Sequence, residues 1–122
     1  MRAYFFDTYA FYEIIVGNPH YKLYSRNTKI ITTQLNLMEL YYHLLLIFSK
    51  KDALYFFNRY KDYVVAIDNS IVIKAMDFRK DNKKRKLSYA DCIGYTLAKS
   101  MNVRFLTGDQ QFKDINNVEY IK

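Results

Sequence analysis

The sequence is poor in the residues that build disulfide frameworks and linkers, since its 122 residues include one cysteine, one proline and three glycines. The single cysteine, Cys92, excludes an internal disulfide and a cysteine-rich zinc site, so a reducing compartment, most simply the cytoplasm, is expected. The longest uncharged run, residues 40–49, is too short to cross a bilayer. The N-terminus does not match a signal peptide. These absences predict a soluble protein without a membrane partner.

Repeats are absent, and no linker needs to be invoked, so residues 1–122 are expected to form one domain. Negative charge is also scarce, because 12 acidic residues face 19 lysines and arginines, which leaves a net charge of +7. This excess favours polyanions such as nucleic acids, although solubility alone also explains many basic proteins. The thirteen tyrosines could stack on unpaired bases, but most of these rings are expected in the core.

Apolar segments with the period of strands alternate with segments that have the period of helices. Strands are expected at residues 2–6, 29–32, 64–67, 103–106 and 118–121. Helices are expected at residues 8–16, 20–26, 33–48, 51–63, 69–79 and 88–101. Such alternation requires crossover connections, and it predicts a mostly parallel sheet that is covered by helices on both faces, hence a three-layer α/β/α fold.

Residues 87–112 organise the chain, because they combine a helix, a short buried strand and a turn with two carboxylates. Ser88 is a natural N-cap, and Asp91 lies in the first turn of its helix. Asp109 follows the buried strand in a Thr-Gly-Asp turn. Each carboxylate has an ordinary explanation, since helix dipoles favour acids in a first turn and aspartate commonly closes turns.

Asp7 stands at a junction between the first strand and the first helix, where it could serve as a helix cap or as a catalytic acid. Glu39 is the only formally charged side chain between Lys29 and Lys50. A buried carboxylate needs a cation, a basic side chain or hydrogen bonds to stabilise it, whereas a carboxylate on the solvent-exposed edge of the helix would need none of these. One turn further, His43 is expected to be a hydrogen-bonded polar residue rather than a metal ligand.

Asp7 and Asp109 each follow the C-terminal end of a predicted strand, where ligands bind in parallel sheets. Asp91 and Glu39 are expected beside them. Two carboxylates about 4 Å apart repel by about 4 kcal/mol at an effective dielectric of 20, so four of them need a counter-charge. An all-oxygen ligand set favours Mg²⁺ or Mn²⁺, and such ions can activate a water molecule for phosphodiester hydrolysis.

These residues carry a family resemblance. The strand that ends in Asp7-Thr8, the helical Glu39, the run LSYAD at residues 87–91 and the run LTGDQQF at residues 106–112 resemble a PIN-domain ribonuclease, most closely the small VapC-type toxins. The resemblance implies a five-stranded sheet, RNA cleavage with Mg²⁺ or Mn²⁺, frequent homodimers and an antitoxin partner. It also implies metal-bound, catalytic acids at Asp7, Glu39, Asp91 and Asp109.

By the same resemblance, Thr8 and Thr107 would hold or orient the acids. Family members often carry an acid where this chain has Gln111, which bears on a second metal position. Six of the eight residues 79–86 are basic, and this segment directly precedes the helix of Asp91. Its candidates for contact with RNA phosphates are Lys83, Lys84, Arg85 and Lys86, although a solvated loop is the usual role of such a run.

Two other functions share part of this sequence pattern. A phosphatase or phosphotransferase with Asp7 as nucleophile would place a second acid two residues on, where this chain has Tyr9. A non-catalytic RNA-binding or protein-interaction domain would keep the basic segment but would not need four acids. Cys92 has no adjacent base and is expected to be a buried helix residue, not a nucleophile.

Overall fold

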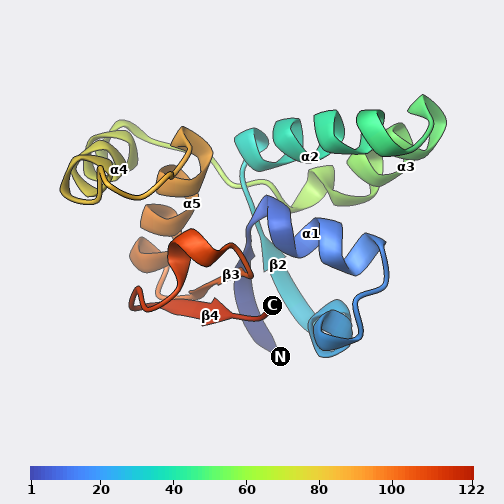
Figure 1. Ribbon diagram of the computed structural model, residues 1–122, viewed down its shortest axis with the longest axis horizontal. Coiled ribbons are helices and arrows are strands. Elements are labelled where there is room, and N and C mark those ends of the chain that lie inside the picture. The colour runs from blue at the N-terminus through green and yellow to red at the C-terminus, as the bar shows by residue number, and fades with distance from the viewer.

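The computed structural model describes residues 1–122 and contains a parallel four-stranded sheet with the strand order β2-β1-β3-β4 (Figure 1). The strands are β1 (Arg2–Phe6), β2 (Thr28–Ile31), β3 (Arg104–Thr107) and β4 (Val118–Tyr120). The α-helices are α1 (Thr8–Ile15), α2 (Gln34–Ile47), α3 (Lys50–Tyr60), α4 (Asn69–Asp81) and α5 (Tyr89–Ser100). Short 3₁₀ helices are η1 (Pro19–Ser25), η2 (Lys61–Tyr63) and η3 (Gln110–Phe112).

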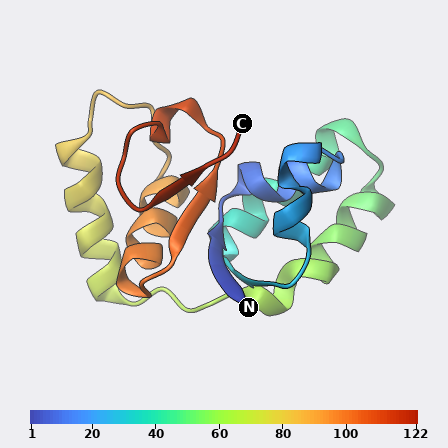
Figure 2. The ribbon, with the colours of Figure 1, turned by 90° about the horizontal axis from the view of Figure 1, so that it is seen from below.

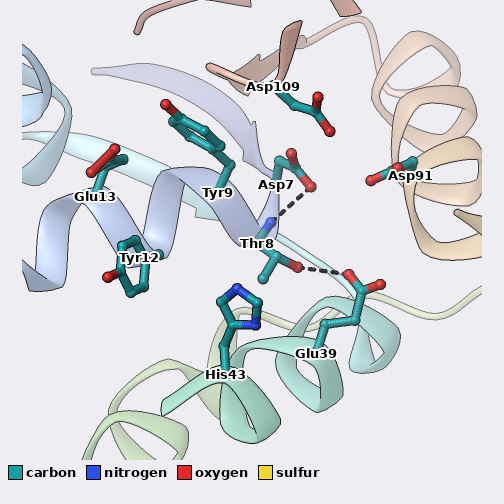
Figure 3. Close-up of a pocket in the computed structure, with 9 residues that line it drawn as sticks. All are labelled: Asp7, Thr8, Tyr9, Tyr12, Glu13, Glu39, His43, Asp91 and Asp109. Atoms are coloured by element: carbon teal, nitrogen blue, oxygen red, sulfur yellow. Dashed lines mark hydrogen bonds between the residues drawn. The ribbon is translucent and has the colours of Figure 1, made fainter. Parts of the chain in front are cut away.

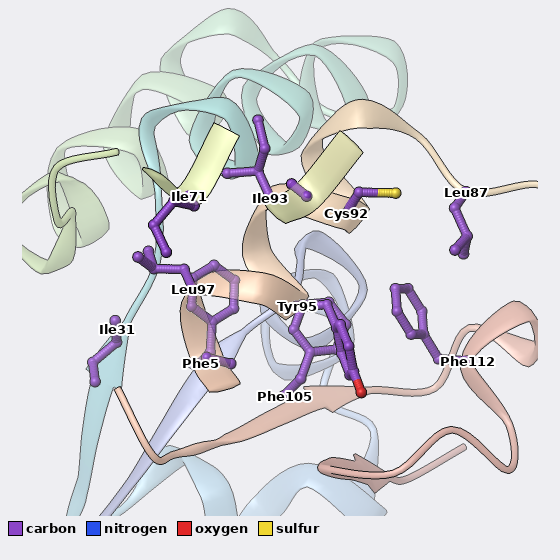
Figure 4. Packing of buried hydrophobic residues seen from close by; sticks show 12 residues of the cluster. Phe5, Ile31, Ile71, Leu87, Cys92, Ile93, Tyr95, Leu97, Phe105 and Phe112 are labelled. Atoms are coloured by element: carbon purple, nitrogen blue, oxygen red, sulfur yellow. The ribbon is translucent and has the colours of Figure 1, made fainter. Parts of the chain in front are cut away.

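Helices cover both faces of the sheet. Successive side chains of its central strands point in opposite directions, so they pack against the helices on opposite faces. Phe5 packs in a cluster with α4 and α5, whose members are shown in Figure 4. Tyr4 and Phe6 pack in a second cluster with α1, α2 and α3. Figure 2 shows these two groups of helices on opposite sides of β1. The predicted three-layer α/β/α class is therefore confirmed.

The expectation of a fifth strand at residues 64–67 is wrong. Val64 forms one isolated parallel bridge to Thr32, with hydrogen bonds from Thr32 N to Tyr63 O (3.1 Å) and from Val65 N to Thr32 O (2.9 Å). Thr33 then caps α2 and turns the chain away from the sheet. Residues 65–67 consequently have no neighbouring strand to pair with, and they form an extended connection to α4.

Close packing fixes α5 over the two central strands. A Cβ atom at Gly94 would lie 2.7 Å from the Phe5 ring and 3.1 Å from the Phe105 ring, so only glycine permits this approach. Asp91 lies one turn before Gly94 and is held near the ends of β1 and β3 by the same packing. None of the helices has the length and apolar character that a membrane span needs.

Candidate active site

Five carboxylates line one pocket of about 310 Å³, and four of them, which come from four separate segments, are the predicted acids (Figure 3). Asp7 directly follows β1, and Asp109 comes two residues after β3, which is paired with β1. Asp91 comes from the first turn of α5, and Glu39 comes from α2. The structure therefore brings Asp7, Glu39, Asp91 and Asp109 to the C-terminal edge of the sheet.

The three aspartates of the pocket also take part in helix capping, Asp7 and Asp109 as N-cap residues and Asp91 as the third helical residue of a capping box, so the capping role and the place in the pocket coexist. Asp7 Oδ1 accepts from Thr8 N (2.8 Å), and Asp109 Oδ1 accepts from Gln111 N (3.0 Å). Asp91 Oδ2 accepts from Ser88 N (2.8 Å) within a capping box. Each cap occupies one carboxylate oxygen and fixes the side chain, which leaves the second oxygen for other contacts.

Two threonines hold the acids from the side. Thr107 Oγ1 donates to Asp7 Oδ2 at 2.7 Å and accepts from Asp109 N at 3.1 Å. Thr8 Oγ1 donates to Glu39 Oε1 at 2.9 Å. Glu39 is thus held by a hydrogen bond, one of the three means of stabilisation that its sequence context allowed. Thr8 and Thr107 each therefore contact one of the acids that the resemblance expected them to hold or orient.

Burial and nearby negative charge make Asp7 and Asp91 reluctant to ionise. Burial, followed by the charge of Asp91, raises the pKa of Asp7 well above its ordinary value. Burial raises the pKa of Asp91 to about 6, with smaller contributions from Glu39 and Asp109, against the opposing hydrogen bond from the Ser88 backbone. The only ion pair of the chain joins Arg104 to Glu119. No lysine or arginine therefore neutralises the pocket.

The chemistry of this donor set fits a hard divalent cation. All the candidate ligands are carboxylate oxygens, and the buried Asp7 and Asp91 lack a positive partner. No three histidine, cysteine, aspartate or glutamate side chains lie close enough together to hold one ion directly. Mg²⁺ commonly keeps several waters and binds through only one or two carboxylates, so it suits an open arrangement of this kind.

The other half of the pocket was not predicted. Its wall includes Tyr9, Tyr12, Glu13 and His43 in addition to Thr8 (Figure 3). His43 is exposed and makes no hydrogen bond within the protein, contrary to the expectation of a hydrogen-bonded polar residue; its ring stands edge-on to that of Tyr12. The four-residue spacings from Thr8 to Tyr12 and from Glu39 to His43 were the available signal, since such pairs share a helix face.

The basic segment lies outside the pocket. Arg85 Nη1 donates to Gln111 O at 2.7 Å, and Lys86 N donates to the Gln111 side chain at 3.2 Å, so these contacts tie the loop to η3. Arg85 is consequently engaged with the protein itself, whereas the side chains of Lys83, Lys84 and Lys86 are exposed. Cys92 is buried, as expected, and burial raises the pKa of its thiol to about 11.

A parallel sheet with acids at the ends of its central strands and helices on both faces defines an α/β protein with an acidic ligand pocket. The chain belongs to the PIN domain family, whose sequence model matches residues 4–118. No curated protein matches the chain.

Solved structures share this fold at low sequence identity. A toxin-antitoxin complex from Klebsiella pneumoniae is 17% identical, with 93% of each chain covered and a TM-score of 0.71. VapBC2 from Rickettsia felis, bound to a DNA fragment from its promoter, is 18% identical over 98% of this chain and 99% of that chain, with a TM-score of 0.73. VapBC-1 from nontypeable Haemophilus influenzae is 16% identical over 97% and 96%, with a TM-score of 0.72.

Proposed function

We propose that this protein is a Mg²⁺- or Mn²⁺-dependent endoribonuclease and the toxin of a toxin-antitoxin pair. The observation that carries the proposal is that Asp7, Glu39, Asp91 and Asp109 line one pocket together with Glu13, and none of these carboxylates has a basic partner. A protein that used these acids only for stability would pair them, as it pairs Glu119 with Arg104. Membership of the PIN domain family supports the nuclease assignment.

Asp7, Glu39, Asp91 and Asp109 are the proposed catalytic and metal-holding residues. A bound divalent ion lowers the pKa of a water molecule and offsets the charge that develops on the attacked phosphodiester. Thr107 keeps one oxygen of Asp7 in place, and Thr8 does the same for Glu39. Exposed Lys83, Lys84 and Lys86 are proposed to contact RNA phosphates beside the helix of Asp91.

The toxin role draws on the structural neighbours, which are named as toxin-antitoxin and VapBC complexes. We propose an antitoxin protein as the partner and a homodimer as the assembly, in the cytoplasm. Expression of this chain in bacteria is expected to arrest growth, and co-expression of a small protein from the adjacent reading frame is expected to restore it. Growth arrest that persists in the Asp7→Asn variant would contradict a nuclease toxin.

The nuclease proposal is tested with purified protein and RNA. Wild-type protein is expected to cleave RNA in Mg²⁺ or Mn²⁺ and to stop when a chelator is added. Asp7→Asn is expected to lower the cleavage rate by more than about 100-fold, because it removes a proposed ligand rather than an outer partner. The Asn side chain keeps the cap on α1, so circular dichroism should show an unchanged fold.

Glu119→Gln is the matched control, since it changes a carboxylate that lies outside the pocket. It is expected to cleave RNA at the wild-type rate. Equal cleavage by wild type and Asp7→Asn would refute the proposed mechanism.

A further inference from the structure

Helices α1 and α2 make two successive side-chain contacts, the first at an acid of the pocket and the second one turn away from it. The first contact is the hydrogen bond from Thr8 on α1 to Glu39 on α2. The second contact lies one turn further along each helix, where the rings of Tyr12 and His43 meet edge-on with centroids 6.0 Å apart and planes at 84° (Figure 3). Tyr12 and His43 line the same pocket as the carboxylates.

The Tyr12 hydroxyl and the His43 ring nitrogens have no hydrogen-bond partner within the protein. Three buried or half-buried tyrosines donate their hydroxyl groups to protein oxygens: Tyr21 to Ile121, Tyr24 to Glu119 and Tyr95 to Asn116. Tyr12 is also half-buried, but its hydroxyl makes no such bond, and neither does the ring of the exposed His43. These two residues therefore line the pocket with polar groups that remain free to bind a ligand.

We propose that Tyr12 and His43 bind an unpaired nucleobase of the RNA, next to the phosphodiester at the carboxylates. This inference rests on the proposed ribonuclease function and adds two substrate-binding residues to it. Glu13 and Glu39 flank this part of the pocket and would repel a phosphate, whereas a neutral base would not be repelled. Two perpendicular rings also offer a face for stacking and polar edges for hydrogen bonds to the base.

This site sets the class of substrate. A base can reach these two rings only after it has left its own stack, so the protein should act on single-stranded RNA or on loops, not on paired regions. Hydrogen bonds from the Tyr12 hydroxyl and the His43 ring would distinguish bases by their edges. These two residues should therefore influence the sequence at which the RNA is cut.

The test measures binding separately from cleavage. Fluorescence anisotropy of a labelled single-stranded RNA is followed with Asp7→Asn protein in Mg²⁺, and a gel shows that the RNA stays intact. Adding His43→Ala or Tyr12→Ala should weaken binding about tenfold, as loss of a stacked base does. Tyr12→Phe should keep part of the affinity, because the ring remains. His43 is exposed, so its replacement should leave the melting temperature unchanged.

Tyr42→Ala and His20→Ala are the matched controls, because both residues are exposed and neither lines the pocket. Affinity equal to these controls in both His43→Ala and Tyr12→Ala would overturn the inference. Replacing one nucleotide at a time with an abasic unit should reveal a position that weakens binding in the parent protein but not in the His43→Ala protein. The absence of such a position would also overturn it.

Cleavage mapping separates this inference from the function on which it rests. If otherwise wild-type protein cleaves RNA, His43→Ala should change the preferred cut sites, while Tyr42→Ala should not. An unchanged pattern would refute the base-binding site and leave the nuclease standing. A wild-type protein that binds RNA through His43 but never cleaves it would support the base-binding site and refute the nuclease.

Discussion

Asp91 is buried and Glu119 is half-buried, and the surroundings of the two carboxylates differ. Glu119 lies 3.1 Å from Arg104 Nη1 and accepts a 2.7 Å hydrogen bond from the Tyr24 hydroxyl. Asp91 has no basic partner, and its neighbours Asp7, Glu39 and Asp109 are carboxyl groups as well. The protein therefore completes the ion pair on the sheet surface and leaves the charge at the C-terminal edge uncompensated. This difference favours an external cation at the pocket over a purely structural role.

Among the residues that support the carboxylates rather than belong to them, the largest effect on RNA cleavage is expected for Thr107→Val, which removes the hydrogen bond to Asp7 Oδ2 and leaves Asp109 N without its acceptor. Residues that orient metal ligands typically contribute about 10- to 100-fold to activity, so the RNA cleavage rate should fall by this factor. Thr107→Ser keeps the hydroxyl and should restore most of the rate. If Thr107→Val cleaves as fast as wild type, Thr107 does not position Asp7.

Replacing Asp91 should stabilise the protein when no metal is bound. The folded-state pKa of Asp91 is raised from 3.8 to about 6, so the folded protein binds a proton more tightly than the unfolded chain, and stability falls as the pH rises through this window. Asp91→Asn removes the charge and keeps an acceptor for Ser88 N. In chelator at pH 7 it should raise the free energy of unfolding by about 3 kcal/mol.

The measurement is urea unfolding at several pH values between 4 and 8. Asp91→Asn should show a smaller loss of stability with rising pH than wild type shows. A variant less stable than wild type at pH 7, with the same pH dependence, would mean that the charge of Asp91 is already compensated.

The smallest effect is expected for Glu119→Gln, which should lower the free energy of unfolding, whereas Asp91→Asn should raise it. The Arg104 side chain is 58% exposed, so solvent screens the pair, and a pair of this kind contributes about 0.2–1 kcal/mol. The variant should lose stability by no more than this amount, and the loss should shrink in high salt. A stabilising Glu119→Gln would remove the contrast between the two groups of carboxylates.

The sequence allowed the three-layer fold and the meeting of the four acids to be predicted, because both follow from local patterns and the rules of parallel sheets. A buried strand that ends at Asp7 and another that ends before Asp109 must place both acids at one edge. Glu39 was recognisable as an isolated charge on an apolar helix. Their catalytic and metal-holding roles remain predictions.

Features that depend on how distant segments dock were not predictable in the same way. Residues 64–67 have the composition of a strand, but β2 ends before it can pair with them. Arg85 appeared free for RNA in the sequence, and only the docking of η3 shows that it binds Gln111 O. The contact between Tyr12 and His43 depends on how α1 packs against α2, which helix periodicity does not fix.

The most direct measurement of the central claim is a calorimetric titration of Mn²⁺ into metal-free protein. Wild type and Glu119→Gln should bind Mn²⁺ saturably and with equal affinity, whereas Asp7→Asn and Asp91→Asn should bind it much more weakly. Absence of binding to wild type, or equal binding by all four proteins, would contradict the claim that the unpaired carboxylates at this pocket hold a divalent cation.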